Sequence, residues 1–224
     1  MADARREMTF LLAGIERRVL QRIAARVPRT IRSNHLTAIG ILGAVGSGAA
    51  YALTNYSPAW LWVASLMLGV NWLGDSLDGT LARVRNIQRP RYGYYLDHLV
   101  DAVSTAAIGI GLGLSPYMLL SIGTLIVVAY LVLSINVYLE SFAFGEFRLG
   151  YGYLGPTEIR AILIGLNTAL ALGAGLDFRL VGLNMTVLDL IGLAIAAVMI
   201  VLLLVRAFGN LRRLAREEPA APRR

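Results

Sequence analysis

Two pairs of aspartates stand in an otherwise apolar part of the chain, Asp75 with Asp78 and Asp97 with Asp101. Spacings of three and four residues place the members of each pair on one face of a helix. An isolated aspartate at the centre of a membrane-spanning helix costs about 2.5–3.5 kcal/mol, so four of them require compensating partners. Two such faces opposed would surround hard divalent cations with oxygen ligands. The spacing therefore predicts a metal site, with a catalytic role, at these four aspartates.

Small residues and one arginine accompany the acidic pairs. Gly79 and Ala82 follow the first pair, and Gly93 lies one turn before the second. These three small residues leave a helix surface without bulk, which a phosphate can approach closely. Arg83 follows Gly79 by one turn, and its guanidinium group can bind a diphosphate bidentately. The arrangement predicts a metal-bridged diphosphate lying between the two acidic helices.

Two polar residues, Asn71 and His98, lie next to the acidic pairs. Asn71 lies one turn before Asp75, where it would touch a nucleotide or brace a carboxylate, or else form a plain interhelical hydrogen bond. His98 lies between the second pair but is rotated off the face of its aspartates, which favours a structural or supporting role over a catalytic one.

The composition places the chain in a lipid bilayer. Of its 224 residues 57% are apolar and 16% are charged, and the mean hydropathy is +0.63, so too little polar surface is available to cover such a core in water. The net charge of +7 suits anionic lipid headgroups and phosphorylated substrates, and we expect no nucleic acid partner for so apolar a chain. The absence of cysteine excludes disulfides and a thiolate metal site.

The hydropathy pattern predicts an all-α, polytopic membrane protein. Residues 6–27 interleave charged and apolar side chains, which is typical of an amphipathic helix lying in the membrane interface, with a soluble arm as the alternative. Six later segments are each long enough to cross about 30 Å of hydrocarbon. These six predicted transmembrane helices lie near residues 34–54, 58–84, 92–114, 116–143, 157–176 and 186–208.

The positions of the arginines set the predicted orientation. They crowd the N-terminal stretch, the connection between the second and third spans, and the C-terminal end, whereas only Arg179 falls on the other side. Both termini and the aspartates should therefore face the cytoplasm, in a bacterial or archaeal cell membrane. The predicted organisation is a cytoplasmic amphipathic segment (1–33), a six-helix transmembrane catalytic domain (34–208) and a cytoplasmic basic tail (209–224).

The acidic segment resembles the signature of a known enzyme family, the CDP-alcohol phosphotransferases. The placed residues read Asp75-x2-Asp78-Gly79-x2-Ala82-Arg83-x9-Gly93-x3-Asp97-x3-Asp101. Asn34-His-Leu-Thr37, at the start of the first span, also resembles an Asn-x-Leu-Thr element of that family. The resemblance extends over essentially the whole chain.

The resemblance implies transfer of a phosphoalcohol from a CDP-alcohol donor to the hydroxyl of a second alcohol, with release of CMP. It implies two divalent cations, Mg²⁺ or Mn²⁺, and a homodimer among membrane lipids. Asp101 would complete one metal shell and act as the general base on the incoming hydroxyl, which agrees with two-metal chemistry in general. Carried onto this chain, the metal ligands are Asp75, Asp78, Asp97 and Asp101, and the nucleotide site comprises Asn71, Asp78, Gly79, Ala82, Arg83 and Gly93.

The acceptor is less clearly marked. Glu140, Glu158 and Arg160 are candidates for the acceptor pocket, and a buried ion pair locking the fourth and fifth spans is the alternative. Family members that use inositol phosphate, glycerol phosphate or serine resemble one another in basic residues one turn before a glutamate on the fourth span, and here Asn136 takes that place. This departure argues against a phosphorylated acceptor. Gly155-Pro-Thr-Glu158 resembles the choline- and ethanolaminephosphotransferase-like members, whose acceptor is a diacylglycerol. A lipid is therefore expected as acceptor, or as a CDP-diacylglycerol donor.

Two other functions use intramembrane carboxylates. Membrane prenyltransferases also bind magnesium and a diphosphate through aspartate motifs, but their motifs lie on well-separated helices and give no role to Gly79, Ala82 or Arg83. A divalent-cation carrier would explain the acids but not Arg83, and it requires a continuous polar path, whereas the last two predicted spans are almost wholly apolar.

Overall fold

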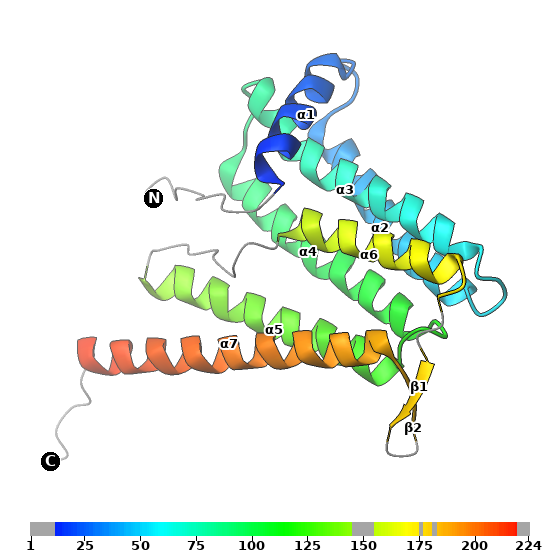
Figure 1. The fold of residues 1–224 in the computed structure, drawn as a ribbon. Helices are drawn as coiled ribbons and strands as arrows, with labels where there is room; N and C mark the ends of the chain where they lie inside the picture. The colour runs from blue at the N-terminus through cyan, green and yellow to red at the C-terminus, as the bar shows by residue number, and fades with distance from the viewer. Residues whose placement is uncertain (1–11, 145–154, 175–176, 181–182, 219–224) are drawn as a thin grey trace, which may run out of the picture.

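The computed structural model describes residues 12–144, 155–174, 177–180 and 183–218, and these residues form an all-α fold with one short β-hairpin (Figure 1). The all-α prediction is thereby confirmed. In chain order the elements are α1 (Ala13–Arg26), α2 (Ser33–Leu53), α3 (Trp60–Val84), α4 (Pro90–Gly113), α5 (Leu120–Phe144), α6 (Pro156–Ala171), β1 (Asp177–Leu180), β2 (Leu183–Thr186) and α7 (Val187–Glu217).

Helices α2 to α7 match the six predicted spans in order, but their lengths differ. Among the described helices, α2, α5 and α7 are long and apolar enough to cross a membrane. Helix α6 has 16 residues, a length of about 24 Å against a hydrocarbon core of about 30 Å. Helix α7 has 31 residues and continues past the predicted boundary at 208/209. The protein is therefore a membrane protein, while the count of six spans stays a prediction.

Helix α2 lies in the middle of the bundle, in backbone contact with α3 and α4. A Cβ atom at Gly43 would lie 2.4 Å from the backbone nitrogen of Asn71 on α3. A Cβ at Gly111 on α4 would lie 2.3 Å from the Cα of Gly48 on α2. Only glycine permits helices to approach so closely, which is a common way of packing helices in membranes. The glycines of α2 thus bring the two acidic helices to either side of it.

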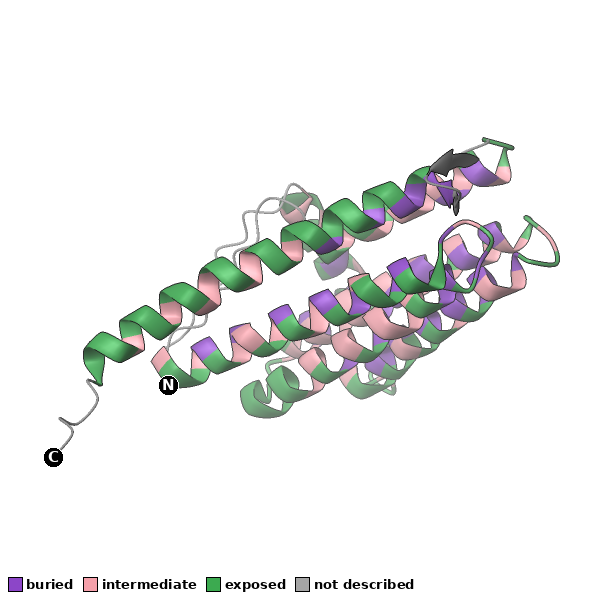
Figure 2. Cartoon of the chain, turned by 90° about the horizontal axis from the view of Figure 1, so that it is seen from below, coloured by how far each residue is buried: buried purple, intermediate pink, exposed green. Residues whose placement is uncertain are grey.

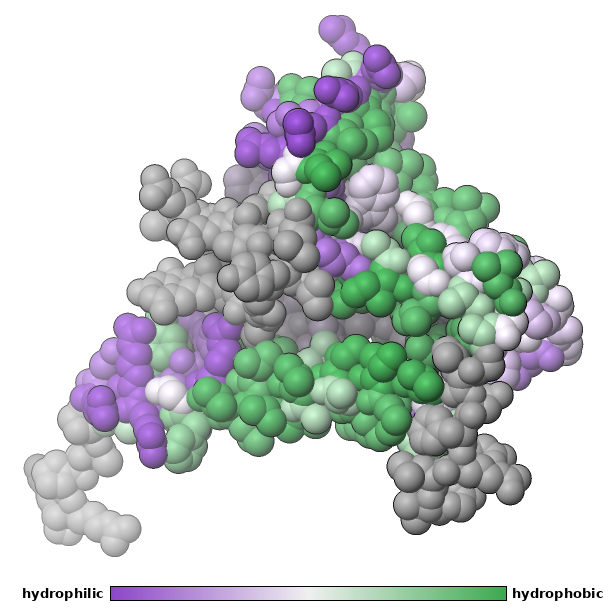
Figure 3. Space-filling view, in the orientation of Figure 1, coloured by the Kyte–Doolittle hydropathy of each residue, from purple (hydrophilic) through white to green (hydrophobic). Residues whose placement is uncertain are grey.

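The remaining helices flank this central group. Helix α6 packs on α3, and α5 packs between α4 and α7. Figure 2 shows buried residues on α7 mainly near its start, with exposed residues along the rest of its length. Figure 3 shows that this exposed length is apolar up to a hydrophilic C-terminal end, as expected of a helix in contact with lipid.

The start of α7 is fixed by a capping box. The backbone nitrogen of Thr186 donates to Asp189 Oδ2 at 2.8 Å, and the backbone nitrogen of Asp189 donates to Thr186 Oγ1 at 3.3 Å. The other oxygen of Asp189 accepts a hydrogen bond from the backbone nitrogen of Leu119 at 2.8 Å, which ties α7 to the start of α5. The antiparallel hairpin β1–β2, which sequence patterning did not predict, leads into this cap.

Helix α1 lies within the segment predicted as an amphipathic helix (6–27), of which residues 6–11 are outside the described residues. It packs against α3, and its buried Leu20 and Ala24 join a cluster with Leu36, Leu77 and Leu81. Its other face is hydrophilic in Figure 3. The position of α1 at a membrane interface stays a prediction.

The close contact of α2 with α3 predicts that Gly43→Ala destabilises the protein. The added Cβ would meet backbone atoms of Asn71, which cannot move without separating the helices. Gly69→Ala on α3 is the matched control, because a Cβ there meets nothing within 4 Å and alanine favours a helix by about 1 kcal/mol over glycine. Thermal unfolding in detergent should show a lower midpoint for Gly43→Ala only. Equal midpoints in the two variants would contradict the close packing.

Candidate active site

One aspartate of the first acidic pair lies close enough to one of the second to interact with it, although the two come from different helices. Asp75 and Asp78 lie on α3, and Asp97 and Asp101 lie on α4. The Asp78 carboxylate interacts electrostatically both with Asp75 on its own helix and with Asp97 across the gap. Like charges this close repel one another, so the group is stable only with cations or donors beside it. A metal site shared by all four aspartates stays a prediction.

The start of α2 holds Asp78 in place. Thr37 donates its hydroxyl to Asp78 Oδ2 at 2.5 Å, and the backbone nitrogen of Gly79 donates to Asp78 Oδ1. One turn earlier, Asn34 donates to the hydroxyl of Tyr92 on α4 at 3.0 Å. The Asn-x-Leu-Thr element of the sequence therefore connects both acidic helices from a single turn of α2.

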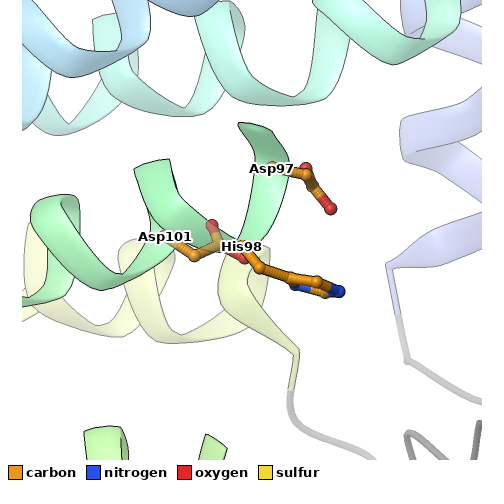
Figure 4. A group of neighbouring side chains, drawn as sticks. All are labelled: Asp97, His98 and Asp101. Carbon is orange, nitrogen blue, oxygen red and sulfur yellow. The ribbon is translucent and has the colours of Figure 1, made fainter. Parts of the chain in front are cut away.

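The second pair forms a compact group with His98. One ligand atom from each of Asp97, His98 and Asp101 lies within 4.8 Å of the other two, and Figure 4 shows their side chains on consecutive turns of α4. The His98 ring contacts Tyr94 edge-on, with 4.2 Å between ring centroids, and lies 4.9 Å from the ring of Tyr138 on α5. His98 is thus closer to the acids than its position on the helical wheel predicts. Two carboxylates and an imidazole are a donor set that suits a divalent cation.

Asp75 is paired with an arginine from a distant part of the chain. Arg160 Nη2 on α6 donates to Asp75 Oδ2 at 2.9 Å, and both side chains are largely buried. Buried ion pairs of this kind balance charge in a medium that solvates it poorly. Arg160, predicted from sequence as an acceptor-pocket residue, therefore lies directly beside a predicted metal ligand.

The residues predicted to hold the nucleotide lie around the same acids. Arg83 donates through Nη2 to the Thr80 hydroxyl at 2.9 Å, and a Cβ at Gly79 would lie 3.4 Å from Arg83 Nη1, so the guanidinium group folds back over Gly79. Gly93 is exposed, and a Cβ there would meet nothing within 4 Å. Ala82 is half-buried. That these residues bind the nucleotide stays a prediction.

Asn71 is fully buried, and its Nδ2 donates to the carbonyl of Gly40 on α2 at 2.9 Å. This is the interhelical hydrogen bond that the sequence left open as one of its roles. Within the described residues, Asn71 Oδ1 is buried and makes no hydrogen bond. A nucleotide contact for Asn71 stays a prediction.

The three acceptor candidates lie in separate surroundings. Glu140 on α5 binds Arg206 of α7 through both carboxylate oxygens and also accepts from Asn136 and Asn210. Glu158 accepts from the backbone nitrogen of Gly155 at 2.9 Å and caps α6. In the part of the chain that the structure describes, the alternative ion pair between the fourth and fifth spans is therefore not formed.

Sequence reasoning missed several residues of this region. Arg206 is a lone charge in the apolar run of α7, a signal that normally marks a functional or paired position in a membrane helix. Tyr130 and Tyr138 of α5 interact electrostatically with Asp101 and form the side of the site that faces α5. No pattern in the sequence distinguishes these two tyrosines from the interfacial ones.

Comparison with known proteins agrees with this geometry. The family model for CDP-alcohol phosphatidyltransferases matches residues 30–202, which covers α2 to α6 and half of α7. The chain belongs to the CDP-alcohol phosphatidyltransferase family. No curated protein matches the chain. Membership makes it a phosphotransferase of phospholipid synthesis in a membrane, in a family that generally uses divalent cations, and it argues against both a prenyltransferase and a cation carrier.

The hydrogen bond to Asp78 predicts that Thr37→Val weakens metal binding. Valine keeps the shape of threonine but removes the donor that orients the carboxylate, and losing such a supporting partner typically costs about 10–100-fold in metal affinity. The control is Thr168→Val, because the hydroxyl of Thr168 donates to the Ile164 carbonyl of its own helix, away from the acids. Calorimetric titration with Mn²⁺ should separate the two variants. Wild-type affinity in Thr37→Val would contradict the supporting role.

Proposed function

We propose that the protein transfers a phosphoalcohol from a CDP-alcohol to the hydroxyl of an acceptor alcohol by direct attack and releases CMP. One of the two substrates carries the lipid, either as a diacylglycerol-type acceptor or as a CDP-diacylglycerol donor. The observation that carries the proposal is the approach of Asp78 on α3 to Asp97 on α4, with the guanidinium group of Arg83 folded over Gly79, within the region that matches the family.

The donor set supports two divalent cations, Mg²⁺ or Mn²⁺, held by Asp75, Asp78, Asp97 and Asp101. The group of Asp97, His98 and Asp101 has the spacing of a cation site, and Asp78 faces it from α3. All the carboxylate oxygens are hard ligands, which suit these ions. When bound, the ions would neutralise the diphosphate and lower the charge on the departing CMP.

The protein's own groups would then orient the substrates. Arg83, which now folds back over Gly79, would extend toward the diphosphate and bind it bidentately. Gly79, Ala82 and Gly93 would leave the room that the nucleotide needs, with Asn71 behind them. Asp101 faces α5 beside Tyr130 and Tyr138, where it would accept the proton of the incoming hydroxyl.

The charge balance of the acceptor side supports an acceptor without a phosphate. Arg206 is matched by Glu140, and Arg160 is matched by Asp75. Neither arginine therefore offers an uncompensated charge to a phosphorylated alcohol, as would be expected if the acceptor were neutral. Glu140 and Arg160 remain our candidates for contacts with it, and Glu158 supports them by capping α6.

The surroundings of the site complete the proposal. We place α2 to α7 across the membrane as six spans, with both termini and the acids on the cytoplasmic side of a bacterial or archaeal cell membrane. The arginine-rich end of α7 and the hydrophilic face of α1 fit the headgroup region there. A homodimer is expected from the family resemblance.

The proposal predicts CMP release from one donor class. Purified protein would be assayed with CDP-diacylglycerol, CDP-ethanolamine and CDP-choline, each against diacylglycerol, serine, glycerol phosphate and inositol phosphate, with Mg²⁺ or Mn²⁺. We expect CMP only from a matched pair that includes a lipid, with Ca²⁺ substituting poorly because its coordination is loose. Release of CMP from no donor, or full release in excess chelator, would contradict the proposal.

Asp101→Asn should separate binding from chemistry. Asparagine keeps the size and one oxygen of the side chain but cannot accept the proton, so kcat should fall about 10²–10⁴-fold while CDP-alcohol binding weakens only modestly. Asp75→Asn is the comparison variant, and it should weaken metal and nucleotide binding together. Metal and CDP-alcohol binding would be measured by calorimetry, and kcat by a turnover assay, for both variants. Near-normal turnover in Asp101→Asn would remove the base assignment.

A further inference from the structure

Glu16 of α1 binds three side chains on two other helices. Its Oε1 accepts hydrogen bonds from Trp72 Nε1 at 3.0 Å and from the Ser76 hydroxyl at 2.8 Å, both on α3. The same oxygen accepts from the Thr157 hydroxyl on α6 at 3.0 Å. Hydrogen bonds to a carboxylate are stronger than those between neutral groups. A residue predicted only as one charge of an interfacial helix therefore joins α1, α3 and α6.

The donors of Glu16 adjoin the ion pair at the candidate active site. Ser76 follows Asp75 directly on α3, and Thr157 lies one turn before Arg160 on α6. A second bond joins the same helices, because the backbone nitrogen of Leu12 donates to Glu158 Oε1 at 2.8 Å. Helix α1 thus holds the first turn of α6 at the place where Arg160 reaches Asp75.

Among the described residues, the contacts at the start of α6 are mainly polar. The buried residues of α6 are Glu158, Asn167 and Leu170, and Leu170 lies in its last turn. The start of α6 is held by the bonds to Glu16 and to the backbone of Leu12, together with the ion pair between Arg160 and Asp75. Small displacements there would move Arg160 away from the acids.

Helix α1 is itself held firmly enough to act as a support. Just after its C-terminal end, the carbonyls of Ile31 (2.6 Å) and of Val27 and Pro28 (2.9 Å) accept hydrogen bonds from Arg85, the residue that caps the end of α3. In between, Leu20 and Ala24 are buried against α2 and α3. Helix α1 is thus attached to α3 along its length, and Glu16 extends that attachment to α6.

We propose that Glu16 is a positioning residue that holds the start of α6 against α3 and so keeps Arg160 beside Asp75. The inference rests on the proposed function for its kinetic consequence, but its structural consequence is independent of any activity. A purely structural Glu16 would affect stability alone, and a residue that only contacts lipid headgroups would not act on α6.

The experiment measures the position of α6 directly. The chain has no cysteine, so two introduced cysteines can carry spin labels on exposed sites, Leu66 of α3 and Ile162 of α6. A control pair uses Leu66 and the exposed Leu139 of α5. In Glu16→Ala we expect the α3–α6 distance distribution to broaden or shift while the α3–α5 distribution stays unchanged. Unchanged α3–α6 distances would overturn the proposal, whether or not the wild type releases CMP.

Kinetics on the same variants test the consequence for the site. Glu16→Ala should raise the KM of the acceptor about tenfold, the scale of one lost hydrogen bond to a charged group, with less than about a twofold change in the donor KM. Glu16→Gln keeps an accepting oxygen and should recover most of the effect, and Thr157→Val should reproduce part of it. Glu217→Ala, an exposed carboxylate on α7, is the control.

A double-mutant cycle separates positioning from general stability. If Glu16 acts through Arg160, Glu16→Ala should add little to the acceptor KM of Arg160→Gln, because coupled residues do not act additively. Independent, additive effects, or a uniform change in every kinetic parameter together with a lower melting temperature, would assign Glu16 a merely structural role and overturn the proposal.

Discussion

Carboxylates in a helix bundle surrounded by lipid need cations or hydrogen-bond donors beside them, and much of the helix arrangement serves to place those partners. Asp75 takes Arg160 from α6, Asp78 takes Thr37 from α2, and Asp97 and Asp101 gather around His98 on α4. The partners of Asp75 and Asp78 come from positions that other helices must hold. The cost of an unpaired charge in a poorly solvating medium is large, so the positions of α2 and α6 follow from the acids as much as from apolar packing.

The glycines of α2 make this arrangement possible. Because α2 touches the backbones of both α3 and α4, Thr37 and Asn34 can reach both acidic helices from one turn. Bulkier residues at Gly43 or Gly48 would move the acids apart and lengthen every contact between them. The close packing of the helices therefore also sets the geometry of the polar site.

The acidic pairs, the all-α class and the positions of most helices could be predicted from local patterns, because helical spacing and hydropathy are properties of single segments. Which side chains form ion pairs and hydrogen bonds between helices could not be predicted in this way. The sequence makes Glu140 an acceptor-pocket candidate, with an ion pair between the fourth and fifth spans as the alternative, but Glu140 binds Arg206 of α7. The sequence gives Glu16 only as one charge of an interfacial helix, but Glu16 binds α6. Which faces of two helices meet depends on how the helices pack, and this is not a property of either segment alone. The hairpin β1–β2 and the short length of α6 have no periodic signal in the sequence that would predict them.

We propose that the two acidic pairs together hold two divalent cations. Titration of the purified wild-type protein with Mn²⁺, with the bound fraction read by electron paramagnetic resonance, tests this without any substrate. We expect two ions bound per chain. A single ion per chain, or none, would contradict it.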